Sequence, residues 1–203
     1  MTAKRKNPLT IQRVLPYLLI IGGIIGLIAS FVLTMDHINL YKNPAFNPDC
    51  NLNPIFSCSP VMKSWQATVF GFPNPLMGLG MFPAQILLGV VMLAGAKMKK
   101  WFWQLFGLSL AGGIGFTLWL IIESAFNIKA LCIYCMMTWI VMFVSAWYVF
   151  QYMLAEKHIH FKSPKITSFL RRRHGDILLA WFIILTGLIL YEFWYFFGPK
   201  LGF

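Results

Sequence analysis

Five long runs of apolar residues, separated by polar segments, dominate the chain. They cover residues 14–35, 76–96, 101–122, 131–154 and 177–197. Each run approaches the ~20 residues that a helix needs to cross the ~30 Å hydrocarbon core of a bilayer. The first run is longer than the apolar part of a cleavable signal peptide, and no small-residue cleavage site follows it. The pattern therefore predicts five retained membrane-spanning helices.

The segment 36–74 separates the first two runs and is a long connection without a spanning helix. It exceeds the ~12–15 residues beyond which a loop is usually functional or disordered. Its aromatic and proline residues favour an ordered cap over the helices. Within it, SPVMKSWQATVF (residues 59–70) predicts a short amphipathic helix with Ser59 as N-cap and Pro60 at the first helical position. We expect this helix to lie flat at the membrane surface, and Asn74 to cap the second spanning helix.

Composition and charge agree with a membrane protein. The chain is 59% hydrophobic and 11% charged, against roughly 25% charged residues in soluble domains. A net charge of +11 would suit nucleic-acid binding, but no binding motif accompanies it, so no nucleic-acid partner is expected. Instead, 13 of the 17 lysines and arginines precede the first run or follow the second and the fourth. The positive-inside rule then places the N-terminus in the cytoplasm and the C-terminus outside.

Two groups of glycines lie within the predicted spans. They are Gly22, Gly23 and Gly26 in the first run, and Gly112, Gly113 and Gly115 in the third. Small residues let the backbones of neighbouring membrane helices approach closely. We therefore expect both groups to lie at close helix contacts in an all-α integral membrane protein.

Four cysteines fall on the outer side of this topology, Cys50 and Cys58 in the long loop and Cys132 and Cys135 at the start of the fourth span. Paired cysteines in exported segments usually form structural disulfides, and that interpretation stays open for the loop pair. It does not explain CIYC, because so small a ring constrains the unfolded chain very little. Zinc is disfavoured, since C-x7-C is not a usual ligand spacing, and no metal is expected. A CxxC is typical of reversible dithiol chemistry.

The start of a helix favours such chemistry at Cys132. Unpaired amide groups and the positive end of the helix dipole stabilise a thiolate, and Lys129 adds positive charge nearby. Cys135 lies one turn deeper and is expected to face the bundle, where a lipid-soluble partner could reach it. Two cysteine pairs on one face can pass two electrons in series by thiol–disulfide exchange. A quinone, which takes two electrons and dissolves in lipid, fits as the acceptor.

These motifs together resemble the vitamin K epoxide reductase family. They are DCNLNPIFSC (residues 49–58), Ser64, NPLMG (residues 74–78) and CIYC (residues 132–135), in that order, and the resemblance covers about residues 14–154. It implies a four-helix transmembrane bundle around a quinone, with a fifth helix at 177–197 as in bacterial members. It also implies a multi-pass protein of the bacterial inner membrane whose active site is extracytoplasmic.

The resemblance further assigns roles to the four cysteines. It implies that Cys50 exchanges with a redox partner, that Cys58 bridges to Cys132, and that Cys135 faces the quinone. The expected activity is quinone-dependent thiol oxidation that generates disulfides in exported proteins, with ubiquinone or menaquinone as acceptor. Two alternatives stay open: reduction of a quinone epoxide, as in vertebrate relatives, and a non-enzymatic membrane scaffold with structural disulfides.

Three other positions acquire roles only by this resemblance. Asn74 corresponds to the family asparagine that hydrogen-bonds a quinone oxygen, and Ser64 to a serine that supports the reactive centre. Trp139 stands where vertebrate members have a quinone-contacting tyrosine, and its indole N–H can donate but not accept a hydrogen bond. Many relatives continue into a thioredoxin-like domain. For residues 1–203 we expect a single membrane domain and a separate thioredoxin-like (DsbA-like) partner.

Overall fold

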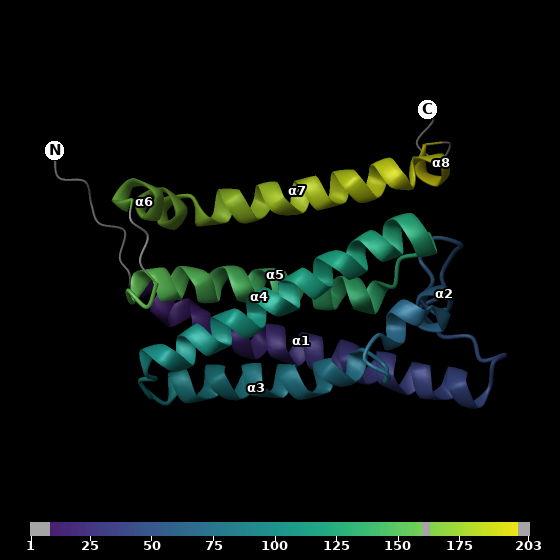
Figure 1. Ribbon diagram of the computed structural model, residues 1–203, viewed down its shortest axis with the longest axis horizontal. Coiled ribbons are helices and arrows are strands. Elements are labelled where there is room, and N and C mark those ends of the chain that lie inside the picture. Colours follow the sequence, from purple (N-terminus) through teal and green to yellow (C-terminus); the bar gives the residue numbers. More distant parts are fainter. Residues whose placement is uncertain (1–8, 160–162, 199–203) are drawn as a thin grey trace.

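The computed structural model describes residues 9–159 and 163–198, and the chain within these ranges is built from helices (Figure 1). Five of them are long and apolar enough to cross a membrane, which agrees with the five predicted spans: α1 (Leu9–Lys42), α3 (Pro75–Leu93), α4 (Lys100–Ile122), α5 (Ile133–Ala155) and α7 (His174–Glu192). The shorter elements are α2 (Cys58–Lys63), η1 (Trp65–Thr68), η2 (Glu123–Ile128), α6 (Pro164–Arg172) and α8 (Trp194–Phe197). The all-α membrane fold is thus confirmed.

Four of the long helices form a bundle, and the fifth lies along its outside. α1 packs along α3 and against α5, and α4 packs against α5, whereas α3 and α4 make few close contacts with each other. α7 runs beside the bundle (Figure 1) and buries none of its residues fully. It contacts α5 through aromatic rings, with the centroids of Phe143 and Trp181 5.3 Å apart. The arrangement leaves the four-helix bundle to form the core.

The first helix continues beyond the predicted end of its apolar run. α1 reaches Lys42, so Asp36 and His37 are helical residues and the long loop begins only at residue 43. The helix ends where Asn43 precedes Pro44, because a residue before proline is disfavoured in the helical region. The Asn43 side chain then accepts a hydrogen bond from the backbone N–H of Ala45 at 3.0 Å, which starts the loop with a turn.

The loop helix is shorter than predicted and differently capped. In place of one helix over residues 59–70, α2 ends at Lys63 and a separate 3-10 turn, η1, begins at Trp65. Ser64 between them has an extended backbone conformation. The N-cap position is Ser57 rather than Ser59, and its side chain makes no capping bond. The fifth predicted helix is likewise interrupted, since α7 ends at Glu192 and α8 follows it.

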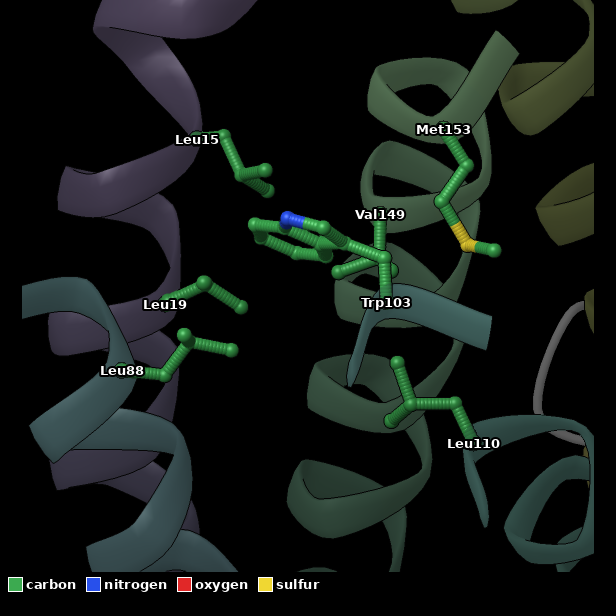
Figure 2. Packing of buried hydrophobic residues seen from close by; sticks show 7 residues of the cluster. All are labelled: Leu15, Leu19, Leu88, Trp103, Leu110, Val149 and Met153. Atoms are coloured by element: carbon green, nitrogen blue, oxygen red, sulfur yellow. The ribbon is translucent and has the colours of Figure 1, made fainter. Parts of the chain in front are cut away.

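At the end of the bundle opposite α2, buried apolar side chains pack around Trp103. We call its buried members the Trp103 cluster: Leu15, Leu19, Leu88, Trp103, Leu110, Val149 and Met153. Figure 2 shows these side chains, contributed by all four helices of the bundle, gathered around Trp103. The ring of Tyr152 also contacts it, with centroids 4.5 Å apart. This end of the bundle is filled by side chains.

The two glycine groups behave differently from one another. A Cβ atom at Gly26 would lie 2.4 Å from the Phe82 ring, and one at Gly23 2.5 Å from Ile86, so the predicted close contact is confirmed between α1 and α3. On α4, however, a Cβ at Gly112 or Gly115 would meet nothing within 4 Å. The expectation of close contacts is therefore wrong for these two, whereas it holds for Gly113, whose Cβ would lie 2.4 Å from Met142 of α5. Gly112 instead borders a cavity.

Candidate functional site

Three of the four cysteines lie together in a small buried cluster at the end of the bundle that carries α2, which we call the cysteine end. The cysteine cluster consists of Leu33, Leu40, Cys50, Cys58, Met62 and Cys132, and Cys135 packs against it. Cys50 and Cys58 form a disulfide with their Cα atoms 5.8 Å apart, whereas Cys132 and Cys135 are free thiols. The exposed fractions of Cys50, Cys58 and Cys132 are 5%, 0% and 1%. The fold thus brings both pairs into one apolar environment.

A short backbone pairing holds the loop against the segment before the CxxC. Phe56 forms a parallel β-bridge with Leu131. The N–H of Leu131 donates to the carbonyl of Ile55 at 2.7 Å, and the N–H of Ser57 donates to the carbonyl of Leu131 at 3.0 Å. The residues that follow, Cys58 on one segment and Cys132 on the other, are therefore brought to the same place. No periodicity in the sequence signals so short a pairing.

Asn51, next to Cys50, ties the loop pair together and was not singled out from the sequence. Its Oδ1 accepts from the backbone N–H groups of Cys58 and Ser59 at 2.8 and 3.1 Å and from the Ser57 hydroxyl at 2.8 Å. It thereby supplies the N-terminal cap of α2 from outside the helix. The sequence predicted Ser59 as the N-cap. A cap supplied by a residue seven positions upstream has no local sequence pattern by which it could be recognised.

Cys132 occupies the N-cap position of α5. Its Sγ accepts a hydrogen bond from the backbone N–H of Cys135 at 3.4 Å. Hydrogen bonding from the Cys135 side chain lowers the pKa of Cys132, with smaller contributions from backbone N–H groups at the helix start, while burial and the charge of Asp36 oppose it. The expectation that Lys129 stabilises this thiolate is wrong, because Lys129 pairs with Glu192 at the end of α7.

A cavity of about 440 Å3 opens beside the CxxC, between α1, the loop helices, α3, α4 and α5. Four residues singled out from the sequence line it: Cys135, Asn74, Ser64 and Trp139. Gly112 and Gly113 form part of the wall on the side of α4. The volume lies within the roughly 300–1,000 Å3 of typical small-molecule sites. The cavity is thus reached by the inner cysteine of the CxxC and borders the cysteine cluster, because Leu33 and Met62 of that cluster also line it.

Asn74 does not cap α3 as expected. Its side chain makes no capping bond, and its Nδ2 instead donates to the backbone carbonyl of Gln66 at 2.7 Å. Its Oδ1 is buried and has no hydrogen-bond partner within residues 9–159 and 163–198. Gln66 is held in turn, because its Nε2 donates to Glu123 at 2.7 Å. The amide of Asn74 is therefore fixed at the cavity wall with unused hydrogen-bonding capacity.

Sequence reasoning missed Glu123 and Gln66 as parts of this network. Glu123 begins the π-helical turn η2, a rare geometry that often occurs at functional sites. The turn directs its carboxylate to both Gln66 and Asn127, at 2.7 Å each. The sequence predicted only that the third span ends near residue 122, and the apolar pattern gives no indication of a π-helical turn after it. Among the described residues, no group of three or more His, Cys, Asp or Glu side chains is placed to hold a metal ion.

The cavity fits the size and polarity of a quinone ring. Its lining is mostly apolar, with a few polar groups at fixed positions, as in sites that bind flat hydrophobic ligands. The amide group of Asn74 retains a second N–H that could donate to a quinone oxygen and a free oxygen that could accept from a quinol hydroxyl. Trp139 is buried and contributes its ring to the wall.

Comparison with known families agrees with this geometry. A model of the vitamin K epoxide reductase family matches residues 17–150, a segment that contains all four cysteines, Asn74 and Trp139. A comparison with individual curated proteins gives no match. The match spans the four-helix bundle and its loop. The chain therefore belongs to the vitamin K epoxide reductase family, whose membership implies a quinone-linked oxidoreductase.

Proposed function

We propose that the protein oxidises thiols at the expense of a membrane quinone and thereby generates disulfides in exported proteins. The observation that carries the proposal is the placement of the two cysteine pairs. Cys58 and Cys132 share one buried cluster, while Cys135, one turn along α5, reaches the cavity. Electrons that enter at the loop would thus have a continuous path to a bound quinone.

The relay balances over three exchanges. A reduced partner dithiol reduces the Cys50–Cys58 disulfide and becomes a disulfide itself. The loop dithiol then reduces a Cys132–Cys135 disulfide through a Cys58–Cys132 mixed disulfide. Finally the Cys132 and Cys135 thiols give two electrons and two protons to the quinone, and their disulfide forms again. The pairing described here, a loop disulfide with a reduced CxxC, is the one that this last step requires.

The electron donor that we propose is a separate thioredoxin-like (DsbA-like) protein that attacks Cys50. Cys50 is the more exposed member of the loop disulfide, although only 5% of it is exposed. Attack by a partner therefore needs neighbouring loop residues to move. The last turn of α1 and the loop around Cys50 carry exposed apolar side chains, Tyr41 at 88% and Leu52 at 66%. Such side chains suit transient contact with a partner protein.

We further propose that the cysteine end faces the extracytoplasmic side of a bacterial inner membrane. The start of α1, the α3–α4 connection and α6 lie at one end of the molecule, and α2 lies at the other (Figure 1). The described basic residues in or next to those segments, including the one after α5, are Arg13, Lys97, Lys99, Lys100, Lys157, Lys165, Arg171, Arg172 and Arg173. Lys4, Arg5, Lys6 and Lys162 lie outside the described residues. The positive-inside rule supports this orientation.

Asn74, Trp139 and Ser64 would serve the same site in different ways. We propose that Asn74 hydrogen-bonds a quinone oxygen and that Trp139 packs beside the ring. The Ser64 hydroxyl donates to the carbonyl of Val61 at 2.7 Å, so it stabilises the break between α2 and η1. Its supporting role would then be to shape the cavity wall rather than to contact the reacting atoms.

The test is quinone reduction by the purified protein, followed by absorbance. Reduced thioredoxin or dithiothreitol would serve as donor, and short-chain ubiquinone, menaquinone and vitamin K epoxide as separate acceptors. The variants are Cys132→Ala and Cys135→Ala, with Met137→Ala as a matched control. Met137 lies on the same helix, is 42% exposed and does not line the cavity.

We expect turnover with a quinone that falls to background in both cysteine variants and is unchanged in the control. In Cys135→Ala, a Cys58–Cys132 bond should still form and be detectable by mass spectrometry without reduction. Quinol production that persists in Cys135→Ala would refute the relay. Turnover with the epoxide alone would favour epoxide reduction, and no turnover with any acceptor would favour a structural role for the cysteines.

A further inference from the structure

Two side chains on the cavity wall carry buried polar atoms without a partner. Among the described residues, His37 Nδ1 and Asn74 Oδ1 are the cavity-lining members of that group. Three other polar side chains on the wall already have hydrogen-bond partners. The hydroxyls of Ser64 and Thr138 donate to backbone carbonyls, at 2.7 and 2.8 Å, and the amide of Gln66 donates to a carboxylate. Because an unpaired buried polar atom costs free energy, His37 is poised to bond a ligand in the cavity.

His37 is also chemically distinct from the rest of the wall. Among the described residues that line the cavity, only His37 and Cys135 have titratable side chains, and of the two only an imidazole is a type of group that exchanges protons near neutral pH. Reduction of a quinone to a quinol needs two protons at the ring oxygens as well as two electrons. Cys135 is itself oxidised in that step, so it cannot remain the acid. The imidazole is the remaining side chain on the wall suited to proton transfer.

The position of His37 is fixed by a rigid element. Ser30, Leu33 and His37 all line the cavity, and their spacing of three and four residues places them on one face of α1. Leu33 at the same time belongs to the cysteine cluster with Cys132. The face of α1 that carries His37 therefore lies beside both the CxxC and the cavity. The charged group next to it on α1 is Asp36, which acts on Cys132.

We propose that His37 hydrogen-bonds a ring oxygen of the bound quinone and transfers to it a proton from the Cys132/Cys135 dithiol. The two S–H bonds break and one S–S bond forms. Two electrons pass to the quinone, one proton reaches a ring oxygen through the imidazole, and the second reaches the other oxygen, so that the imidazole returns to its starting state. This inference rests on the proposed function and adds a catalytic residue to it.

The test compares His37→Gln and His37→Ala with the wild-type protein in the reduction of short-chain ubiquinone by dithiothreitol. Glutamine keeps a hydrogen-bonding group but cannot transfer a proton, whereas alanine leaves room for added imidazole. His158→Gln is the matched control, because His158 stacks near Trp103 at the other end of the bundle and does not line the cavity. Reduction of the Cys50–Cys58 disulfide by dithiothreitol is measured separately by thiol labelling.

General acid–base catalysis is typically worth ~10²–10⁴ in rate, so we expect kcat to fall about 10²-fold in both His37 variants. Added imidazole should raise kcat of His37→Ala, which a purely structural role would not allow. Labelling of the loop disulfide and the His158→Gln rate should match wild type. A His37→Gln rate within about twofold of wild type, or no response to imidazole, would overturn the inference alone. Absence of quinone reduction by the wild type would instead refute the proposed function.

Discussion

The two ends of the bundle use the same four helices in opposite ways. Around Trp103, side chains from α1, α3, α4 and α5 meet and leave the core filled (Figure 2). At the cysteine end the same helices surround a cavity of about 440 Å3, with α4 presenting Gly112 and Gly113 to it. The difference follows from side-chain size on α4, which places a tryptophan at one end and glycines at the other. Packing around Trp103 holds the four helices together, and the cavity lies at the cysteine end of the same helices.

The polar groups are divided in the same manner. The Trp103 cluster consists of apolar side chains and the indole. The cavity, by contrast, has polar groups held by fixed partners, such as the bond from Asn74 to the Gln66 carbonyl and the bond from Gln66 to Glu123. Between helices in lipid, where the hydrophobic effect is weak, tight packing is the main source of stability. We therefore expect substitutions at the closed end to change stability and those at the open end to change activity.

Trp103→Ala should produce the largest effect on stability. Truncation of a buried tryptophan usually costs about 3–5 kcal/mol, and we expect a value near the lower end, because lipid replaces water around the unpacked helices. Thermal unfolding in detergent would measure it. Activity per folded molecule should stay unchanged, since no member of the Trp103 cluster lines the cavity. A loss of activity without a loss of stability would contradict the division between the two ends.

Gly112→Leu should fill the cavity without disturbing the helices. A Cβ at Gly112 meets nothing within 4 Å, so the added side chain has room, but it would occupy the cavity that we propose for the quinone. We expect KM for a short-chain ubiquinone to rise about tenfold, which corresponds to ~1.4 kcal/mol.

Gly115→Leu is the matched control for that substitution. Gly115 is on the same helix and equally free of neighbours, but it does not line the cavity. Its KM should remain at the wild-type value, and thermal unfolding should be similar in both variants. Equal rises in KM would show that the site lies elsewhere.

Asn51→Ala should loosen the loop at the cysteine end. The variant loses three hydrogen bonds to the Asn51 oxygen, including the cap of α2, and loss of an N-cap costs about 1 kcal/mol. Hydrogen exchange should rise in α2 and around Cys58 while the Trp103 cluster stays protected. Unchanged protection of α2 would show that the disulfide alone holds the loop.

The smallest effect concerns the protonation of Cys132. Hydrogen bonding from Cys135 lowers the pKa of Cys132 below that of an ordinary thiol, so its thiolate persists to lower pH and is lost as the pH falls through that pKa. Ultraviolet absorbance of the thiolate against pH would report it. In Cys135→Ala the titration midpoint should move to higher pH, and Cys132→Ala should abolish the signal. A midpoint that does not move would remove Cys135 as the cause.

Much of the architecture follows from local patterns that the sequence displays directly. A run of about twenty apolar residues must span the bilayer as a helix, because backbone polar groups in lipid have to be satisfied within the segment. The five spans were predictable for this reason, as were the positions of the CxxC at a helix start and of Gly23 and Gly26 at a close helix contact. The ordered cysteine motifs also sufficed to suggest the family.

Other features depend on contacts that lie outside the repeat of a single helix, most of them between segments far apart in the chain. The cap of α2 comes from Asn51, the pairing of Phe56 with Leu131 joins the loop to the CxxC, and Lys129 is paired with Glu192 instead of serving the thiolate. None of these contacts produces a periodic pattern in the sequence from which it could be predicted. Residue types and spacing decide which helices form. Only the packing of those helices decides that α4 stands apart from α3, that a cavity opens there, and that His37 and Asn74 reach it together, because such contacts join residues that no local pattern relates.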